Sequence, residues 1–421
     1  MKGSGGRARL RLPRSIAVLR HRDYALVQGG AAISNLGTWM QYVGIGWALR
    51  GLTSWEFALG LSFVAQFGPS LILAPGAGVL ADHFDRRRIV IVATSAQAIP
   101  PIAIGWFITQ HRLTIGWLLG LAALGGIAQA VSMPAASAIV PRLVPPDETH
   151  QAVTFGTAAV NITRVGGPAI GGAAIHLWGL DWAFYLNAIS FGAVVVAWAI
   201  VRPAGTRATP AEREARGTLR EGIAYARTHH LVRHLLVLNM VIGGFMFHAP
   251  LMPAFARDVL GGDSWTYSLL TSATGVGAVL GAFMAGELRA DRQRWIAVIG
   301  AALLCPMSLL AFAASTRVPF SVVALVGFGV GYFLFLATSQ SMLILATPDE
   351  FRGRVMGLFG MSSVGAVPFA GLAGGALAGL IGPRAAVVAA ALCVLLYAAR
   401  VAIGERGTGA GLSESEQALV H

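Results

Sequence analysis

The sequence predicts an all-α polytopic membrane protein whose twelve transmembrane helices form two pseudo-symmetric six-helix bundles. The first observation behind this prediction is composition. Only 12% of the 421 residues are charged and 55% are hydrophobic, whereas soluble domains carry about 25% charged residues. The second is a series of long runs with almost no charge, and the third is a repeat of short motifs between the two halves of the chain.

The charge-poor runs recur twelve times. Lipid offers the backbone no hydrogen-bond partner, so only helices or closed barrels span a bilayer, and runs of about 20 residues are too long for barrel strands. Most runs exceed the roughly 30 Å hydrocarbon core at about 1.5 Å per helical residue, so we expect tilted helices. The runs are 25–49, 57–81, 89–109, 113–140, 152–178, 182–201, 235–256, 264–286, 295–316, 318–348, 355–383 and 385–399.

Positive charge predicts the orientation. If the N-terminus starts inside, the inner segments hold 25 of the 31 Lys and Arg residues, as the positive-inside rule requires. We therefore expect both termini in the cytoplasm. The net charge of +12 does not indicate nucleic acid, because the charges lie between apolar runs and form no continuous basic face.

The expected domains follow from these runs. The longest polar break begins with a linker and continues as a surface helix over 219–235. The domains are a cytoplasmic N-terminal segment at 1–22, an N-terminal bundle at 23–201, a cytoplasmic connector at 202–234, a C-terminal bundle at 235–404 and a cytoplasmic tail at 405–421.

The two bundles repeat one another. A Pro-Asp-Glu triplet at 146–148 returns at 348–350, and a Gly- and Pro-rich stretch at 167–172 returns at 368–375. Parallel repeats of six helices are typical of transporters that hold the substrate between the repeats near mid-bilayer.

The densest charge cluster, at 78–88, lies between two apolar runs. A carboxylate at Asp82 can accept backbone N–H groups from the start of a neighbouring helix, which we expect near 354–357. Arg86 and Arg87 are expected to pair with the acids at 349–350. The predicted gating residues, which would latch the inner end in an outward-facing state, are Asp82, Arg86, Arg87, Glu287, Asp349, Arg352 and Arg354. The alternative is that these are ordinary charges of inner loops.

Two ionisable side chains lie inside the runs. Arg164 would be expensive to bury in lipid, and Asn161 lies one turn earlier on the same helix face, so both are expected to line a water-filled cavity. The alternative for Arg164 is snorkelling to lipid headgroups. His248 is a candidate proton carrier or a packing histidine. All 19 acids lie near helix ends or in loops, so a coupling carboxylate would be Asp23, Glu56 or Glu287.

Neutral polar residues within the runs predict a substrate path. They either face the central cavity or form interhelical hydrogen bonds, and they are Asn35, Trp39, Gln41, Gln66, Gln129 and Gln340. With Phe63, Phe67 and Phe333 nearby in sequence, they favour a large, partly apolar substrate over a sugar or an anion.

Small residues predict where helices approach closely or bend. Pro168 removes one backbone hydrogen bond, and we expect helix bending at Gly167, Pro168, Gly171 and Gly172. Glycines four residues apart predict close helix crossings, at 116/120, 167/171, 277/281, 327/331 and 371/375.

No cofactor and no metal site are expected. His229, His230 and His234 have no Cys or acid to complete a metal site, and the chain has no Gly-x4-Gly-Lys nucleotide loop. A membrane enzyme such as an acyltransferase would need a paired base and nucleophile at membrane depth, and none is visible, so we expect no enzyme.

Over residues 15–404 the chain resembles the major facilitator superfamily. The cluster at 78–88 is similar to the family's signature between helices 2 and 3, with His83 and Asp85 as departures. The stretches 35–41, 134–135 and 353–358 resemble the drug and siderophore exporter branch that includes the enterobactin exporter, and 167–172 resembles the antiporter signature on helix 5. The family's helix 4 arginine is absent, since 113–140 contains no charge.

The resemblance implies a secondary active transporter that exports amphipathic, drug- or siderophore-like molecules across the bacterial plasma (inner) membrane by proton antiport and alternating access. Its expected partners are a small-molecule substrate, the proton and membrane lipids, and we expect a monomer. A lysophospholipid flippase, a nutrient importer and a sensor without transport remain alternatives.

Overall fold

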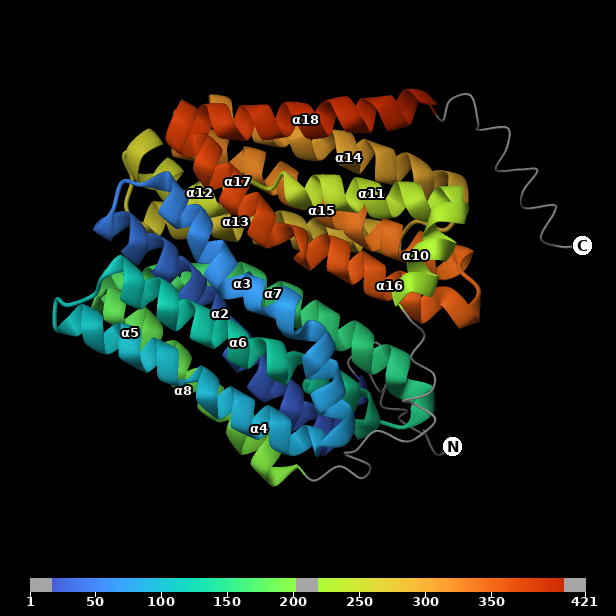
Figure 1. Cartoon of the computed structure of the whole chain (residues 1–421), viewed down its shortest axis with the longest axis horizontal. Helices are drawn as coiled ribbons and strands as arrows, with labels where there is room; N and C mark the ends of the chain where they lie inside the picture. The colour runs from blue at the N-terminus through green and yellow to red at the C-terminus, as the bar shows by residue number, and fades with distance from the viewer. Residues whose placement is uncertain (1–16, 202–218, 405–421) are drawn as a thin grey trace, which may run out of the picture.

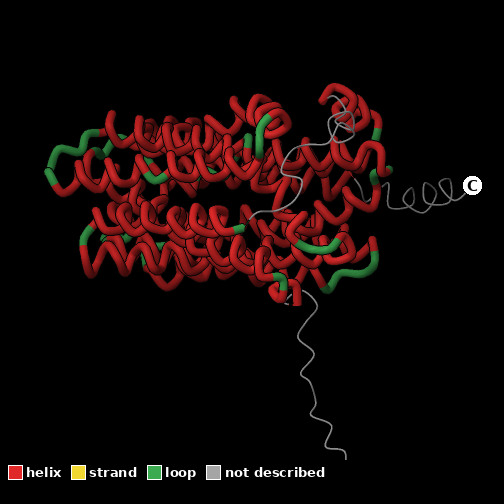
Figure 2. The backbone as a smooth tube through the Cα atoms, turned by 90° about the horizontal axis from the view of Figure 1, so that it is seen from below, coloured by secondary structure: helices red, strands yellow, loops and turns green. Residues whose placement is uncertain are grey.

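The computed structural model describes residues 17–201 and 219–404, which form helices packed in two halves (Figure 1). The expectations for 1–16, for the linker at 202–218 and for the tail at 405–421 lie outside these residues. Helices run along the long axis of the molecule, and most loops gather at its two ends (Figure 2). The described residues include no strand, and the all-α fold class is confirmed.

The N-terminal half contains six spanning units, counting α4 and α5 as one. Its elements are η1 (Val18–Arg20), α2 (Arg22–Leu52), α3 (Glu56–His83), α4 (Arg86–Gln97), α5 (Ile99–Thr109), α6 (Ile115–Ile139), η2 (Val140–Leu143), η3 (Pro146–Glu148), α7 (Thr149–Trp178) and α8 (Leu180–Ile200).

The C-terminal half also contains six spanning units and is preceded by the short helix α10. Its elements are α10 (Leu219–Thr228), α11 (His230–Gly244), α12 (His248–Ala254), η4 (Phe255–Val259), α13 (Ser264–Gly286), α14 (Asp291–Ala314), α15 (Val318–Ala346), α16 (Asp349–Val364), α17 (Ala366–Ile381) and α18 (Pro383–Gly404).

Ten spanning units of the described chain are long and apolar enough to cross a membrane. The helices α2 and α7, of 31 and 30 residues, are also long enough but less apolar. In α7 this is because His150, Asn161 and Arg164 interrupt the apolar sequence. With these two, the structure agrees with the twelve expected spans.

Proline and glycine divide three spans into shorter helices. Pro100 and Pro101 follow the junction of α4 and α5, and Gly365 separates α16 from α17. The seventh span unwinds between α11 and α12, close to Pro250 and Pro253. Each proline lacks the N–H that would continue the helical ladder, so these breaks follow from sequence.

The connector differs from the expectation at its C-terminal end. A single surface helix was expected over 219–235, but α10 ends at Thr228 and α11 begins at His230. His229 adopts an extended backbone and its ring stacks on Tyr225 at 3.7 Å. The seventh span therefore starts before residue 235.

Close crossings occur at some of the expected glycine pairs. A side chain at Gly277 or Gly281 of α13 would collide with α15 backbone at Val326 or Val330, so these glycines allow the two helices to touch. Gly116 and Gly120 have nothing within 4 Å of an added Cβ, and this pair makes no crossing.

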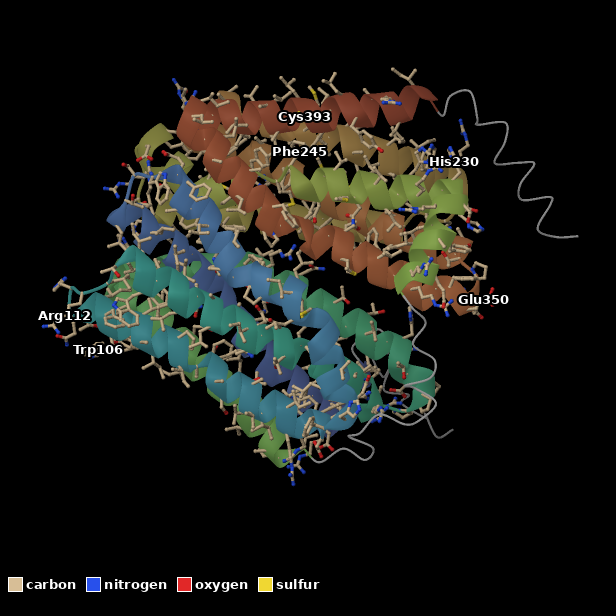
Figure 3. All side chains as sticks on the ribbon, viewed as in Figure 1. Trp106, Arg112, His230, Phe245, Glu350 and Cys393 are labelled. Carbon is tan, nitrogen blue, oxygen red and sulfur yellow. The ribbon has the colours of Figure 1, made fainter. Side chains whose placement is uncertain are left out.

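The two halves meet along two helix pairs, α3 with α17 and α7 with α13. Figure 3 marks the ends of the molecule: Trp106 and Arg112 lie at one, His230 and Glu350 at the other. We call the latter the inner end, following the charge distribution. In Figure 1 the halves diverge towards it.

Candidate functional site

The side chain of Arg164 lies between the two halves. Its guanidinium carbon is 5.0 Å from the ring centre of Trp39 on α2 and 4.7 Å from that of Phe333 on α15. Stacking on aromatic faces stabilises a desolvated cation. We call Trp39, Tyr42, Gln129, Arg164 and Phe333 the central site.

Aromatic rings extend the central site into the N-terminal half. The rings of Trp39 and Tyr42 are 5.2 Å apart, those of Tyr42 and Phe67 5.5 Å, and those of Phe67 and Phe63 5.6 Å. The Tyr42 hydroxyl lies beside the Gln129 side chain. The site therefore offers one cation and a wide aromatic wall, which suits a ligand with charged and apolar parts.

The glycines of α7 bring these groups together. An added Cβ at Gly167 would collide with the Trp39 side chain, and one at Gly171 would lie 2.9 Å from the Cα of Met40. On the opposite side, an added Cβ at Gly172 would collide with the Ser268 side chain of α13. Pro168 is buried within α7, which continues to Trp178 without interruption. The structure shows that these residues provide close packing, while bending remains a prediction.

The predicted substrate-path residues do not all converge. Gln41 accepts a hydrogen bond from Asn187 Nδ2 at 2.6 Å, and Gln66 Nε2 donates to the Ser62 carbonyl at 2.9 Å. Both therefore make helix contacts within the N-terminal half. Gln340 is exposed near the inner end of α15.

Asn35 on α2 and Asn161 on α7 are half-buried. His248 is 2% exposed, and its ring packs edge-on against Phe328 of α15 at 4.3 Å. The histidine thus lies in the interior of the C-terminal half. This placement favours the packing interpretation that the sequence left open.

The outer end is closed by an ionic cluster of which sequence analysis selected only Glu56, as a candidate coupling carboxylate. Arg50, at the end of α2, pairs with Asp258 of η4 and lies 3.5 Å from Glu56 at the start of α3. Arg257 Nη1 donates to the Arg50 carbonyl at 2.9 Å. We call Arg50, Glu56, Arg257 and Asp258 the outer gate, because it joins the two halves.

The inner charges of the N-terminal half pair within that half. Arg86 Nη2 lies 3.6 Å from the Asp82 carboxylate, and both side chains are buried. Arg87 donates to the carbonyls of Trp198 at 2.7 Å and Val201 at 2.9 Å, so it caps α8. Arg87 was expected to pair with the acids at 349–350. In this structure it contacts the end of α8 instead.

The inner charges of the C-terminal half have local partners too. Arg352 pairs with Asp349 at 2.5 Å on the same helix, and Arg354 pairs with Glu221 of α10 at 2.9 Å. Glu287 is exposed at the end of α13. The contact of Asp82 with the start of α16 was predicted for an outward-facing state, and in this structure it stays a prediction.

Helix packing shows which end is closed. Near the outer end, Gly375 of α17 packs on α3, where an added Cβ would lie 3.1 Å from the Gly60 Cα. Further in, Gly365 still meets Leu71, but Gly353 and Gly357 of α16 have nothing within 4 Å. The halves are in contact at the outer end, through α3 with α17 and through the outer gate, and they diverge towards the inner end (Figure 1), which is an inward-facing arrangement.

The comparisons with known proteins agree with this architecture. A family model described as transmembrane secretion effector matches residues 14–406. The staphyloferrin A transporter of Staphylococcus aureus is 27% identical over 58% of this chain and 62% of its own length, so the match spans less than two thirds of that protein. The enterobactin exporter of Shigella dysenteriae is 24% identical over 75% of this chain and 76% of its own.

A solved bacterial homologue of the human lysosomal transporter Spinster, inward-facing and unoccupied, is similar in structure. It superposes with a TM-score of 0.69 at 14% identity and covers 94% of this chain and 96% of its own. The likeness at this identity concerns the fold. The family match and this fold confirm the resemblance drawn from sequence, and the chain belongs to the major facilitator superfamily, in the transmembrane secretion effector family.

Proposed function

We propose that this protein is a secondary active exporter that moves amphipathic small molecules out of the cell by alternating access. The observation that carries the proposal is the combination of a closed outer gate, an inner end at which the halves diverge (Figure 1) and a central site shared by both halves. Such a state receives its ligand from the inner side, as an exporter requires. We further propose a monomer in the bacterial plasma membrane with both termini inside.

The related proteins suggest the kind of substrate. One relative is named for staphyloferrin A and another for enterobactin, which are both siderophores. The aromatic wall of Trp39, Tyr42 and Phe67 suits a large ligand with apolar surface. We therefore propose siderophore-like or drug-like compounds.

Proton coupling is assigned to the outer gate. The acids of the described spans lie at helix ends, and Glu56 and Asp258 face the buried Arg50. Protonation neutralises these carboxylates and removes their attraction for Arg50, which would open the outer end. When the pairs with Arg50 form again, the protons are expelled, and antiport requires that they leave towards the inner side.

The inner charges are proposed to close the other end. In the outward-facing state, Asp82 would accept the backbone N–H groups at the start of α16, where a carboxylate is favoured. Arg354 would then exchange its present partner, Glu221, for groups of the N-terminal half. Asp82→Asn should reduce export at normal expression, and unchanged export would remove the latch.

The test is transport by the purified full-length protein in proteoliposomes with an imposed pH gradient. A panel of siderophores, dyes and drugs is offered, and at least one compound should move against its gradient while the pH gradient dissipates. The double variant Glu56→Gln, Asp258→Asn should bind that compound but lose its dependence on pH. Arg384→Gln, at the same end but bonded within its own half to the Ser315 carbonyl, is the matched control.

Three results would contradict the proposal. They are the absence of any pH-driven movement, full coupling in the double variant, and movement of a fluorescent lysophospholipid without movement of any soluble compound. The last would favour the flippase.

A further inference from the structure

The most unusual group in the spanning region is Arg164. It is at the midpoint of the 30-residue α7, about 20 Å from either helix end at about 1.5 Å per residue. Its guanidinium carbon lies over Trp39 of one half and Phe333 of the other, so in this structure the side chain is directed at the interface between the halves and not at lipid headgroups. Nearby, an added Cβ at Gly275 of α13 would lie 3.0 Å from the Arg164 carbonyl oxygen, which places the residue at the crossing of the two halves.

This cation has no counter-ion among the residues that the structure describes. Its neighbours are neutral aromatic side chains, Trp39 and Phe333 with Tyr42 and Tyr332. The Nε atom is buried without a hydrogen-bond partner. The side chain is only partly exposed; a charge at this depth without a partner is unfavourable, and two aromatic rings compensate for only part of that. An anion would supply the missing partner.

The geometry also indicates how an anion would bind. The guanidinium carbon lies over both rings, and a planar guanidinium keeps its N–H donors in its plane. Those donors match a carboxylate or another oxyanion, which accepts two parallel hydrogen bonds. Because the rings belong to different halves, a ligand held here touches both and connects them.

We propose that Arg164 binds an anionic group of the exported molecule, a carboxylate or sulfonate, while Trp39 and Phe333 flank its aromatic or apolar body. The inference rests on the proposed export function and specifies its substrate class as amphipathic anions. It revises the sequence-based expectation, which favoured an apolar ligand over an anion because most polar groups within the spans are neutral.

The experiment compares two probes that differ in charge alone, 2-naphthoate and 2-naphthamide. Their binding to the purified full-length protein in detergent is measured by isothermal titration calorimetry. The wild type should bind the naphthoate about tenfold more tightly, as one charge-assisted pair predicts. Arg164→Gln should remove this preference, and Arg164→Lys should retain part of it, because lysine keeps the charge but not the planar donors. Arg88→Gln, a change of an exposed arginine at the inner end, should leave both affinities unchanged.

Equal affinity for the two probes, or no binding of either, in the wild type would overturn the inference, and this comparison does not depend on whether a variant folds. A preference that survives Arg164→Gln in a monodisperse protein would also overturn it. The proposed export function and the anion site can be refuted independently of each other. If naphthoate binding depends on Arg164 but no compound moves in proteoliposomes, the anion site stands without export. If neutral compounds are exported equally by wild type and Arg164→Gln, export stands without the anion site.

Discussion

The outer gate makes a quantitative prediction about the balance between inward- and outward-facing states. Arg50 is 7% exposed, whereas Asp258 is 37% and Glu56 is 19% exposed. Breaking a fully buried ion pair costs about 3–5 kcal/mol, and an exposed pair contributes about 0.2–1 kcal/mol. The gate lies between these limits, so Arg50→Gln should destabilise the closed outer end by about 1–2 kcal/mol. That shifts the population towards the outward-facing state by about 5- to 30-fold.

Double electron–electron resonance measures this shift directly. Spin labels at Gln110→Cys and Thr316→Cys, in exposed outer loops of opposite halves, report the separation of the outer ends. The exposed native Cys393 is replaced by serine. In Arg50→Gln the long-distance population should grow at neutral pH, because the acids then lack their cation.

The control is Arg384→Gln, which removes an arginine bonded within the C-terminal half and should leave the distances unchanged. An Arg50→Gln distribution identical to wild type would refute the reasoning. So would an equal response in the control, since the effect would then reflect charge at that end in general.

Three further predictions concern other parts of the molecule. Gly60→Val should abolish export while the protein still elutes as a single species, because the new side chain would collide with the Gly371 carbonyl where α3 crosses α17. Glu221→Gln should speed amide exchange in α10 by about two- to fivefold, since it breaks the 2.9 Å pair with Arg354, a partly exposed pair of modest strength. Asp263→Ala should lower Tm at neutral pH, because the hydrogen bond from the Thr266 N–H, at 3.0 Å, holds the pKa of this carboxylate below its ordinary 3.8. A carboxylate whose pKa is lower in the folded state stabilises the fold at pH values above its ordinary pKa. The Tm difference from wild type should therefore vanish as the pH falls through the folded-state pKa.

Matched variants separate these effects from general damage. Gly120→Val adds the same side chain where nothing lies within 4 Å and should export normally. Asp349→Asn breaks a pair inside α16 and should not change exchange in α10. A Tm difference for Asp263→Ala that persists at low pH would assign the effect to helix propensity.

The fold was predictable because each membrane span has a local signature in the sequence. A run of about 20 apolar residues predicts a membrane helix without reference to any other part of the chain, and the positive-inside rule orients it. Arg164 was also identified, because a formal charge in the middle of such a run is rare.

The pairing of charges at helix ends was not predictable in the same way. Arg50 and Asp258 are 208 residues apart, and each alone looks like an ordinary terminal charge. Their contact exists only because α2 and η4 meet when the two halves dock. Arg87 shows the same limit: its position in a charged cluster predicted a gate, and nothing in the sequence indicated that folding would also bring the last carbonyls of α8 within its reach.

The sequence also did not predict which way a polar side chain within a span points. His248 is surrounded by the interior of the C-terminal half because α15 places Phe328 against it. Gln41 and Gln66 form bonds inside the N-terminal half. Composition selects polar residues within a run, but only packing decides which of them face the centre.

The central claim is that the two halves rock about the central site, so that one end opens as the other closes. The most direct test records both ends in one protein, with the outer label pair above and an inner pair at Thr154→Cys and Ala290→Cys, both exposed near the inner end. In lipid nanodiscs Arg50→Gln, which removes the cation of the outer gate, should lengthen the outer distance and shorten the inner one in the same sample. Distances that do not respond, or that change in the same direction at both ends, would contradict the account.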